Sequence, residues 1–89
     1  MKVLTVEIKN EAGLHARPSS KFVEVTSKYD SEITVHTDNE AVKGKSIMGL
    51  MLLGAEKGRR LKLVANGVDE HQLLEALRQL VEEEKFNEE

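Results

Sequence analysis

The hexapeptide GLHARP, residues 13–18, places an ionisable nucleophile where a loop meets a predicted helix. His15 falls at the expected N-cap, and Pro18 in the first turn loses no hydrogen bond, because first-turn amides have no intrahelical partner. The amides of Ala16 and Arg17 can therefore face an anion. A helix N-terminus carries roughly half a positive charge, and the Arg17 guanidinium adds donors for the same oxygens. The pattern indicates a phosphate-handling site.

A histidine at such a position can accept a phosphoryl group and release it again. Histidine is nucleophilic in its neutral form, and the free amino-acid side chain is partly neutral near pH 7, which makes it a common phosphoryl acceptor. Phosphoryl transfer asks the protein mainly for positioning and charge stabilisation, so His15, Arg17 and two backbone amides can suffice. From these residues alone, an exposed loop histidine without chemistry stays an open alternative.

Ser46 is the second candidate, at the expected N-cap of a short apolar helix that ends at Gly54. Serine is favoured there for stability alone, because its oxygen accepts an amide hydrogen bond worth about 1 kcal/mol. Phosphorylation would add a charge of about −1.5 to −2, which a helix N-terminus tolerates but which would repel an acidic partner. A structural cap and a regulatory phosphorylation site both fit the sequence.

The apolar residues after Ser46 fit either the core or a partner surface. Six large apolar side chains between residues 47 and 53 cannot all point inward from a two-turn helix, so one or two are expected to be exposed. Met48 and Met51 lie on neighbouring turns. Flexible methionine side chains suit core filling, and they also suit a surface that binds several partners.

Other motifs predict no further site. His15, His36 and His71 lack neighbours at metal-ligand spacing, so we expect neither a metal nor a cofactor. Residues 44–46, GKS, match the end of a nucleotide-binding P-loop, but Asn39 stands where that motif needs its first glycine.

Residue periodicity predicts the elements that position these groups. Alternating apolar residues predict strands at residues 4–8, 32–36, 40–43 and 59–66, and helical spacing predicts helices from residue 15 to about 28, over 46–53 and up to residue 81. Asp69 and Gln72 predict a capping box for the last helix, and the acidic segment 82–89 is expected to fray. On the first helix the spacing predicts a sheet-facing side made of Ala16, Ser20, Val23 and Ser27, joined by Ser19, Phe22 and Thr26.

The element order β-α-β-β-α-β-α predicts an α+β fold. Because each strand alternates, one face of the sheet should be free of helices. We expect an open-faced β-sandwich, a four-stranded antiparallel sheet with three helices on one face, that spans residues 1–89 as a single domain.

Composition excludes several classes of protein. The net charge of −3 and the three aromatic residues argue against nucleic-acid binding. No apolar run is long enough for membrane insertion, and neither a signal peptide nor a cysteine is found, so a cytoplasmic location is expected.

GLHARP together with KSIMGLMLLG, residues 45–54, resembles the HPr family, the histidine-containing phosphocarriers of the bacterial phosphoenolpyruvate-dependent sugar phosphotransferase system. Both motifs match in register, and the resemblance covers essentially the whole chain. It implies that His15 receives a phosphoryl group from phosphorylated enzyme I and donates it to sugar-specific enzyme II components. It also implies that Arg17 neutralises charge and that the amides of Ala16 and Arg17 bind the phosphate. Ala12 departs from many relatives, which carry a small polar residue there.

The same resemblance implies regulation and docking. Ser46 matches the serine that HPr kinase/phosphorylase modifies, with a catabolite-control transcription regulator as a further partner. Leu14, Ile47, Met48 and Met51 match a face that docks enzyme I and the enzyme II components. Three alternatives remain: a regulatory binding module acting mainly through phosphorylated Ser46, a carrier in a paralogous nitrogen-linked relay, and a small α+β module without phosphoryl chemistry.

Overall fold

The segments with alternating apolar residues form the strands of one sheet in the computed structural model, which describes residues 1–88. The strands are β1 (Lys2–Glu7), β2 (Glu32–His36), β3 (Ala41–Lys43) and β4 (Arg60–Asn66). They are ordered β1-β4-β2-β3, and every neighbouring pair is antiparallel. The four-stranded antiparallel sheet predicted from the sequence is confirmed, whereas its strand order was not predicted.

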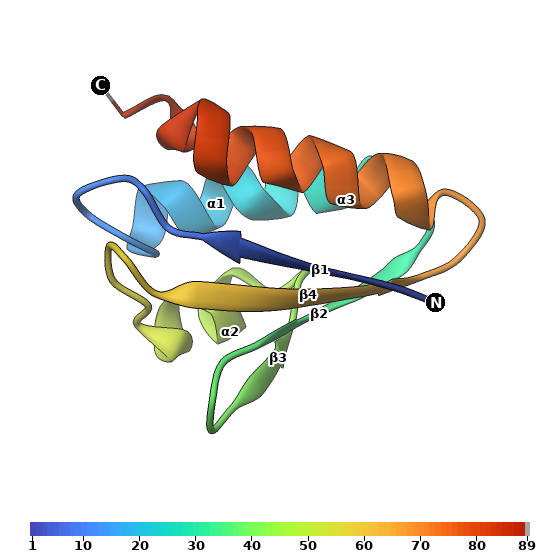
Figure 1. The fold of residues 1–89 in the computed structure, drawn as a ribbon, viewed down its shortest axis with the longest axis horizontal. Coiled ribbons are helices and arrows are strands. Elements are labelled where there is room, and N and C mark those ends of the chain that lie inside the picture. Colours follow the sequence, from blue (N-terminus) through green and yellow to red (C-terminus); the bar gives the residue numbers. More distant parts are fainter. Residues whose placement is uncertain (89) are drawn as a thin grey trace.

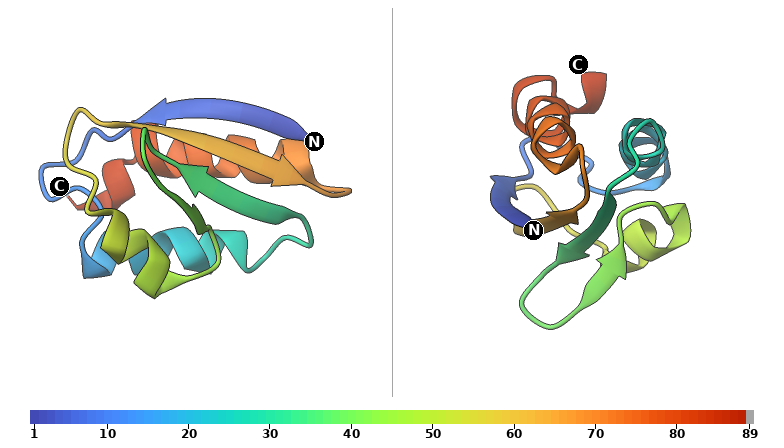
Figure 2. Two further views of the ribbon diagram at one scale, coloured as in Figure 1. Left: turned by 90° about the horizontal axis from the view of Figure 1, so that it is seen from below. Right: turned by 90° about the vertical axis from the view of Figure 1, so that its right-hand side faces the viewer.

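Three helices pack on one side of this sheet. They are α1 (Ala16–Thr26), α2 (Ile47–Leu53) and α3 (Glu70–Arg78), and α3 continues into a π-helical turn, η1 (Gln79–Glu83), and a short 3₁₀ turn, η2 (Lys85–Asn87). Figure 1 shows α1 and α3 over the sheet, and the right-hand view of Figure 2, which looks along the strands, shows α2 beside α1 and β3. The other face of the sheet is open, so the predicted α+β architecture with the order βαββαβα is confirmed.

The strand register explains which side chains form the core. Leu63 is the common partner of Leu4 on β1 and Val35 on β2, so these three apolar side chains lie in one row on the helix-facing side. Leu73 and Leu77 of α3 are fully buried above the sheet. One face of each strand and one stripe of each long helix therefore supply the core, as the apolar spacing predicts.

The buried side of α1 is narrower than the expected one. Ala16, Ser20 and Ser27 are exposed, and Val23 is only partly buried. The buried residues of this helix are Pro18, Ser19, Phe22 and Thr26, so Ser19, Phe22 and Thr26 are buried as predicted and Pro18 was not expected. Phe22 is the largest side chain of the helix, and burying it removes the most apolar area from water, so it determines which face packs inward.

The predicted capping box at the start of α3 is wrong. Asp69 is the N-cap residue, but its side chain makes no capping hydrogen bond. Its carboxylate accepts instead from the backbone amides of Asp30 and Ser31, both at 2.9 Å, and from the Ser31 hydroxyl. Ser31 is only 1% exposed, so its amide needs a partner from the protein, and the carboxylate that could have capped α3 serves the turn before β2.

The end of the chain is also more ordered than expected. Phe86 is fully buried, its carbonyl accepts from the Lys21 ammonium at 2.5 Å, and Glu82 accepts from the backbone amide of Glu7 at 2.8 Å. One aromatic residue within an acidic segment is enough to anchor it, so the prediction that residues 82–89 fray is wrong for the described residues 82–88. Glu89 lies outside the described residues.

No helix within residues 1–88 is long and apolar enough to cross a lipid bilayer.

Candidate functional site

His15 lies at the N-terminus of α1 with its side chain exposed. Its backbone is extended (φ −80°, ψ −170°), which fits an N-cap, and its carbonyl accepts from the amide of Ser19 at 2.9 Å. The imidazole makes no capping hydrogen bond, and helix geometry gives the amides of Ala16 and Arg17 no intrahelical acceptor. The predicted N-cap position is confirmed, and this helix end can receive an anion.

Neighbouring elements, rather than a side-chain cap, fix the loop before His15. The amide of Leu14 donates to the carbonyl of Ala55 at 2.9 Å, and the Ser19 hydroxyl donates to the carbonyl of Leu14 at 3.3 Å. Gly13 has a φ of +68°, and a Cβ there would collide with the Ala55 carbonyl oxygen. Only glycine therefore fits the close approach between this loop and the chain after α2.

Leu14 does not fit the docking role that the resemblance implies. Its side chain is 1% exposed and belongs to the hydrophobic core, so a partner cannot reach it in this conformation. Its burial comes from the closure of the loop onto Ala55, which lies 41 positions further along the chain and which sequence spacing does not reveal.

Arg17 is exposed and lines an open hollow next to the His15 loop. The other lining residues are Glu11 and Ala12 of the loop and Asn87 and Glu88 of the tail. Ala12 brings no hydrogen-bonding side chain to this hollow. The tail residues were not predicted as part of the site, because only the fold brings them to the loop.

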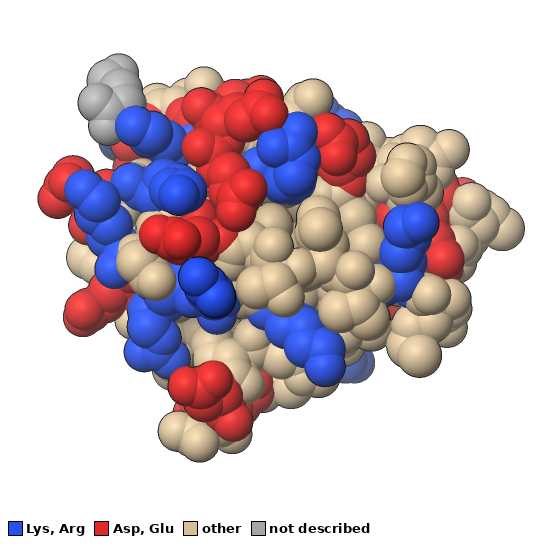
Figure 3. All heavy atoms as spheres, in the orientation of Figure 1, with Lys and Arg blue, Asp and Glu red and all other residues tan. Residues whose placement is uncertain are grey.

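Charged side chains surround the end of the molecule that carries the His15 loop (Figure 3). The Lys57 ammonium donates to the Glu11 carboxylate at 2.5 Å, and this hydrogen bond lowers the pKa of Glu11 below its usual range. In Figure 3, Lys and Arg side chains lie among Asp and Glu side chains toward the end that carries the C-terminus, whereas uncharged atoms cover more of the opposite end.

The surface of α2 is more exposed than predicted. Ile47, Met48, Met51 and Leu52 are 42%, 69%, 42% and 75% exposed, whereas Leu50 is fully buried. Four large apolar side chains face solvent where one or two were expected, because a helix of only seven residues packs a single side against α1 and β3. Leu52 belongs to this surface and was not predicted. We call these four residues the α2 patch.

The C-terminal end of the α2 patch lies next to the His15 loop. The helix ends at Gly54, whose φ of +59° is the left-handed conformation predicted for a C-cap, and the following Ala55 accepts the hydrogen bond from Leu14. A partner that covers the α2 patch would therefore reach His15 as well.

Ser46 lies at the opposite end of α2. Its hydroxyl oxygen accepts from the amide of Gly49 at 3.0 Å, so the predicted N-cap is confirmed. At a rise of about 1.5 Å per residue, the seven-residue helix places Ser46 about 10 Å or more from Ala55. A group attached to Ser46 would border the α2 patch without touching His15.

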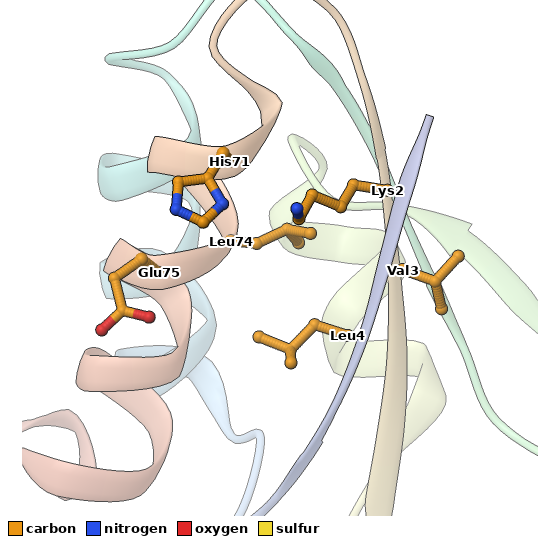
Figure 4. Close-up of a pocket in the computed structure, with 6 residues that line it drawn as sticks. All are labelled: Lys2, Val3, Leu4, His71, Leu74 and Glu75. Carbon is orange, nitrogen blue, oxygen red and sulfur yellow. The ribbon is translucent and has the colours of Figure 1, made fainter.

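The other two histidines, His36 and His71, lie in β2 and α3. The His36 ring is hydrogen-bonded to the Thr34 hydroxyl at 3.0 Å. His71 borders a small hollow between β1 and α3, at the far end of β1 from the His15 loop; in Figure 4 Leu4 and Leu74 point into the space between strand and helix, and Val3 points away. Within residues 1–88, no group of three His, Cys, Asp or Glu side chains is placed to hold a metal ion.

Comparison with known proteins agrees with this geometry. Residues 3–83 match the family model described as "PTS HPr component phosphorylation site". The chain belongs to the HPr family of phosphocarrier proteins. Phosphocarrier protein HPr of Treponema pallidum is 44% identical over 89 residues, which covers 100% of both chains. The crystal structure of HPr-C-His from Thermoanaerobacter tengcongensis is 52% identical and superposes with a TM-score of 0.93 over 100% of this chain and 99% of that one.

A further relative is named as HPr-like. The HPr-like protein Crh of Bacillus subtilis is 40% identical over 79 residues, which is 89% of this chain and 93% of that protein. The fold, the phosphocarrier family and its place in the phosphotransferase system agree with the resemblance identified in the sequence.

Proposed function

We propose that the protein carries phosphoryl groups on His15, accepting them from phosphorylated enzyme I and passing them to sugar-specific enzyme II components. The observation that supports this role best is the exposed imidazole at a helix N-terminus that has no side-chain cap and has Arg17 in its first turn. Membership of the HPr family supports the same role.

The chemistry needs little from the protein besides position and charge. A deprotonated ring nitrogen of His15 attacks phosphorus, an N–P bond forms, and the bond between phosphorus and the donor breaks, with its electron pair leaving on the donor. The amides of Ala16 and Arg17 and the Arg17 guanidinium bind the phosphoryl oxygens. The reverse sequence transfers the group to the next acceptor, so the carrier is used stoichiometrically and returns unchanged.

A labelling experiment tests this role. With labelled phosphoenolpyruvate and enzyme I, the wild-type chain should take up one acid-labile phosphate, and His15→Ala should take up none. His71→Ala is the matched control, because His71 is also exposed and also lies in the first turn of a helix. Undiminished labelling of His15→Ala would refute the assignment.

The protein that accepts the phosphoryl group distinguishes the sugar pathway from a nitrogen-linked relay. Addition of sugar-specific enzyme II components should discharge the labelled chain. Discharge only by components of a nitrogen-linked relay would instead favour that alternative.

We further propose that Ser46 is phosphorylated by HPr kinase/phosphorylase and that this regulates docking on the α2 patch and binding to a catabolite-control transcription regulator. Ser46 lies at the rim of a patch that includes Met48 and Met51, and the chain has a relative named HPr-like protein Crh. A phosphate there adds about −1.5 to −2 charge at a helix N-terminus, which tolerates it, while it repels an acidic partner.

A second label tests the regulatory role. ATP and the kinase should give an acid-stable phosphate that is absent in Ser46→Ala and present in Ser20→Ala, a control with an exposed serine on α1. Retention of the label in Ser46→Ala would remove this residue from the proposal.

A further inference from the structure

Asn10 is a buried polar residue that neither the family motif nor the proposed chemistry uses. Its side chain is 1% exposed and lies three residues before Gly13 in the loop that leads to His15. Its amide nitrogen donates to the carbonyl of Gly13 at 3.0 Å and to the carboxylate of Glu88 at 2.8 Å. One side chain thus joins the His15 loop to a residue 78 positions away, close to the end of the chain.

The other atom of this amide shows what the residue contributes. The Oδ1 of Asn10 is buried and has no hydrogen-bond partner among the described residues. A buried unpaired oxygen lowers stability, and an apolar side chain at this position would avoid that loss. The benefit of Asn10 therefore lies in its two donated hydrogen bonds, one to the loop and one to the tail.

The tail at the other end of this connection is strained. Lys85, Phe86 and Asn87 all have positive φ values, of 50°, 58° and 56°, although none of them is glycine. Three consecutive residues in the left-handed region persist only where the surroundings hold them. The buried Phe86 ring, the Lys21 ammonium on the Phe86 carbonyl and the contact between Glu88 and Asn10 provide that restraint.

The connection ends at the candidate site. Glu88 and Asn87 line the same hollow as Arg17, and the Gly13 carbonyl that Asn10 binds lies two residues before His15. Other hydrogen bonds of the loop run from the Leu14 amide to Ala55, from the Gly13 amide to the Asn10 carbonyl and from the Ser19 hydroxyl to Leu14, and none of them holds the Gly13 carbonyl. The Gly13–Leu14 peptide, which precedes His15, is therefore held on both sides, its N–H by the Ala55 carbonyl and its carbonyl by the side chain of Asn10.

We propose that Asn10 is a positioning residue of the phosphorylation site and that its amide couples the C-terminal tail to the loop that presents His15. The rate effect of this coupling rests on the proposed phosphocarrier function, whereas the coupling itself does not. When Glu88 holds one proton of the amide, the other is directed at Gly13. When Glu88 no longer accepts from it, the side-chain amide of Asn10 can rotate more freely, and the His15 loop becomes less ordered.

The test combines hydrogen exchange with single-turnover transfer. In Asn10→Ala and in Glu88→Ala, the backbone amide of Leu14 should exchange faster than in wild type, while the amides of Gly49 and Leu50 in α2 should keep their rates. The first-order rate constant for transfer from phosphorylated enzyme I should fall about three- to tenfold in Asn10→Ala, the effect of one lost hydrogen bond. The concentration of enzyme I that gives half-maximal rate should not change, because the α2 patch is untouched.

Matched variants separate positioning from general destabilisation. Asn39→Ala removes an exposed turn asparagine and should leave both measurements at the wild-type value. Glu88→Gln keeps an oxygen acceptor for the Asn10 amide and should restore most of what Glu88→Ala loses. The double variant Asn10→Ala/Glu88→Ala should be no slower than Asn10→Ala alone, because both changes break one connection.

Each result of these experiments leads to a different conclusion about the coupling. Leu14 exchange at the wild-type rate in both alanine variants would overturn the coupling, and so would additive effects in the double variant. If the wild-type chain takes no label, the proposed function fails, and the exchange measurement still decides the coupling. If Asn10→Ala does not fold, Glu88→Ala and Glu88→Gln provide the same comparison from the exposed end of the connection.

Discussion

The N-termini of α1 and α2 are built in opposite ways. At α2, the hydroxyl of the N-cap residue Ser46 accepts from the Gly49 amide, so one amide of the first turn is satisfied from within the same segment. At α1, His15 occupies the same position without a capping bond, and the approach to the helix is fixed from outside through Leu14 and Ala55. The N-cap side chain of α1 is therefore available for chemistry, whereas the Ser46 hydroxyl at α2 already serves the Gly49 amide.

The largest expected effect is a loss of stability when a side-chain atom is added where the His15 loop packs closely against Ala55. Gly13→Ala should lower the free energy of unfolding by about 2–4 kcal/mol, because the left-handed backbone disfavours a Cβ and the Cβ would collide with the Ala55 carbonyl. Gly54→Ala has a similar φ of +59° and nothing within 4 Å of the new atom, so it should cost about 1–2 kcal/mol. Urea unfolding measures both variants. Equal losses would show that the contact with Ala55 does not matter.

The next effect concerns the ligand-accepting role of the α1 end. Arg17→Ala should slow phosphoryl transfer from enzyme I about ten- to hundredfold, the effect of losing a charge-assisted hydrogen bond. Arg17→Lys should recover part of the rate, since the charge remains but the forked donor geometry does not. Arg60→Ala removes an exposed arginine from β4 and should transfer at the wild-type rate. A wild-type rate for Arg17→Ala would remove the guanidinium from the mechanism.

The comparison of caps predicts unequal stability losses. Ser46→Ala should lower the free energy of unfolding by about 1 kcal/mol, because the Gly49 amide loses its acceptor. His15→Ala should change it by less than about 0.5 kcal/mol, since an exposed side chain without a capping bond is removed. Thermal or urea unfolding at pH 7 measures the two values. A larger loss at His15 would contradict the view that α1 is held from outside.

The third helix N-terminus gives the smallest effect and a pH dependence. Hydrogen bonds from Ser31 and from the Asp30 amide lower the pKa of Asp69 in the folded protein. The ionised form therefore stabilises the fold above the unfolded pKa of about 3.9, and this contribution is lost as the pH falls through the folded pKa. The difference in Tm between wild type and Asp69→Asn should be present at pH 7 and should narrow below about pH 4. A constant difference across this range would show that the charge of Asp69 is not involved.

Local patterns predicted the parts of the site that depend on neighbouring residues. His15 and Ser46 could be placed at helix N-termini because capping preferences act over three or four positions. The apolar stripe of α3 followed from its spacing, and the HPr resemblance followed from two short motifs in register.

Contacts between distant segments explain the errors. Asp69 turns away from its own helix because the buried amide of Ser31, 38 positions earlier, needs an acceptor. Leu14 is buried by a loop closure onto Ala55, and the tail is held by Lys21 and Asn10. Residue type and spacing do not identify these distant partners. In each case an interaction with a nearby residue is equally plausible from the sequence.

The strand order also governs when the molecule can assemble. β4 is the last strand in the chain, yet it lies between β1 and β2 and pairs with both, with Ala65 opposite Lys2 and Ile33. During synthesis β1 therefore has no partner in the sheet until about residue 66 has been added, whereas the hairpin of β2 and β3 closes within a few residues. Most of the sheet forms through pairings of high sequence separation, which delay folding until the chain is nearly complete. The His15 loop directly follows β1, so we expect it to reach its native conformation only when β1 pairs with β4.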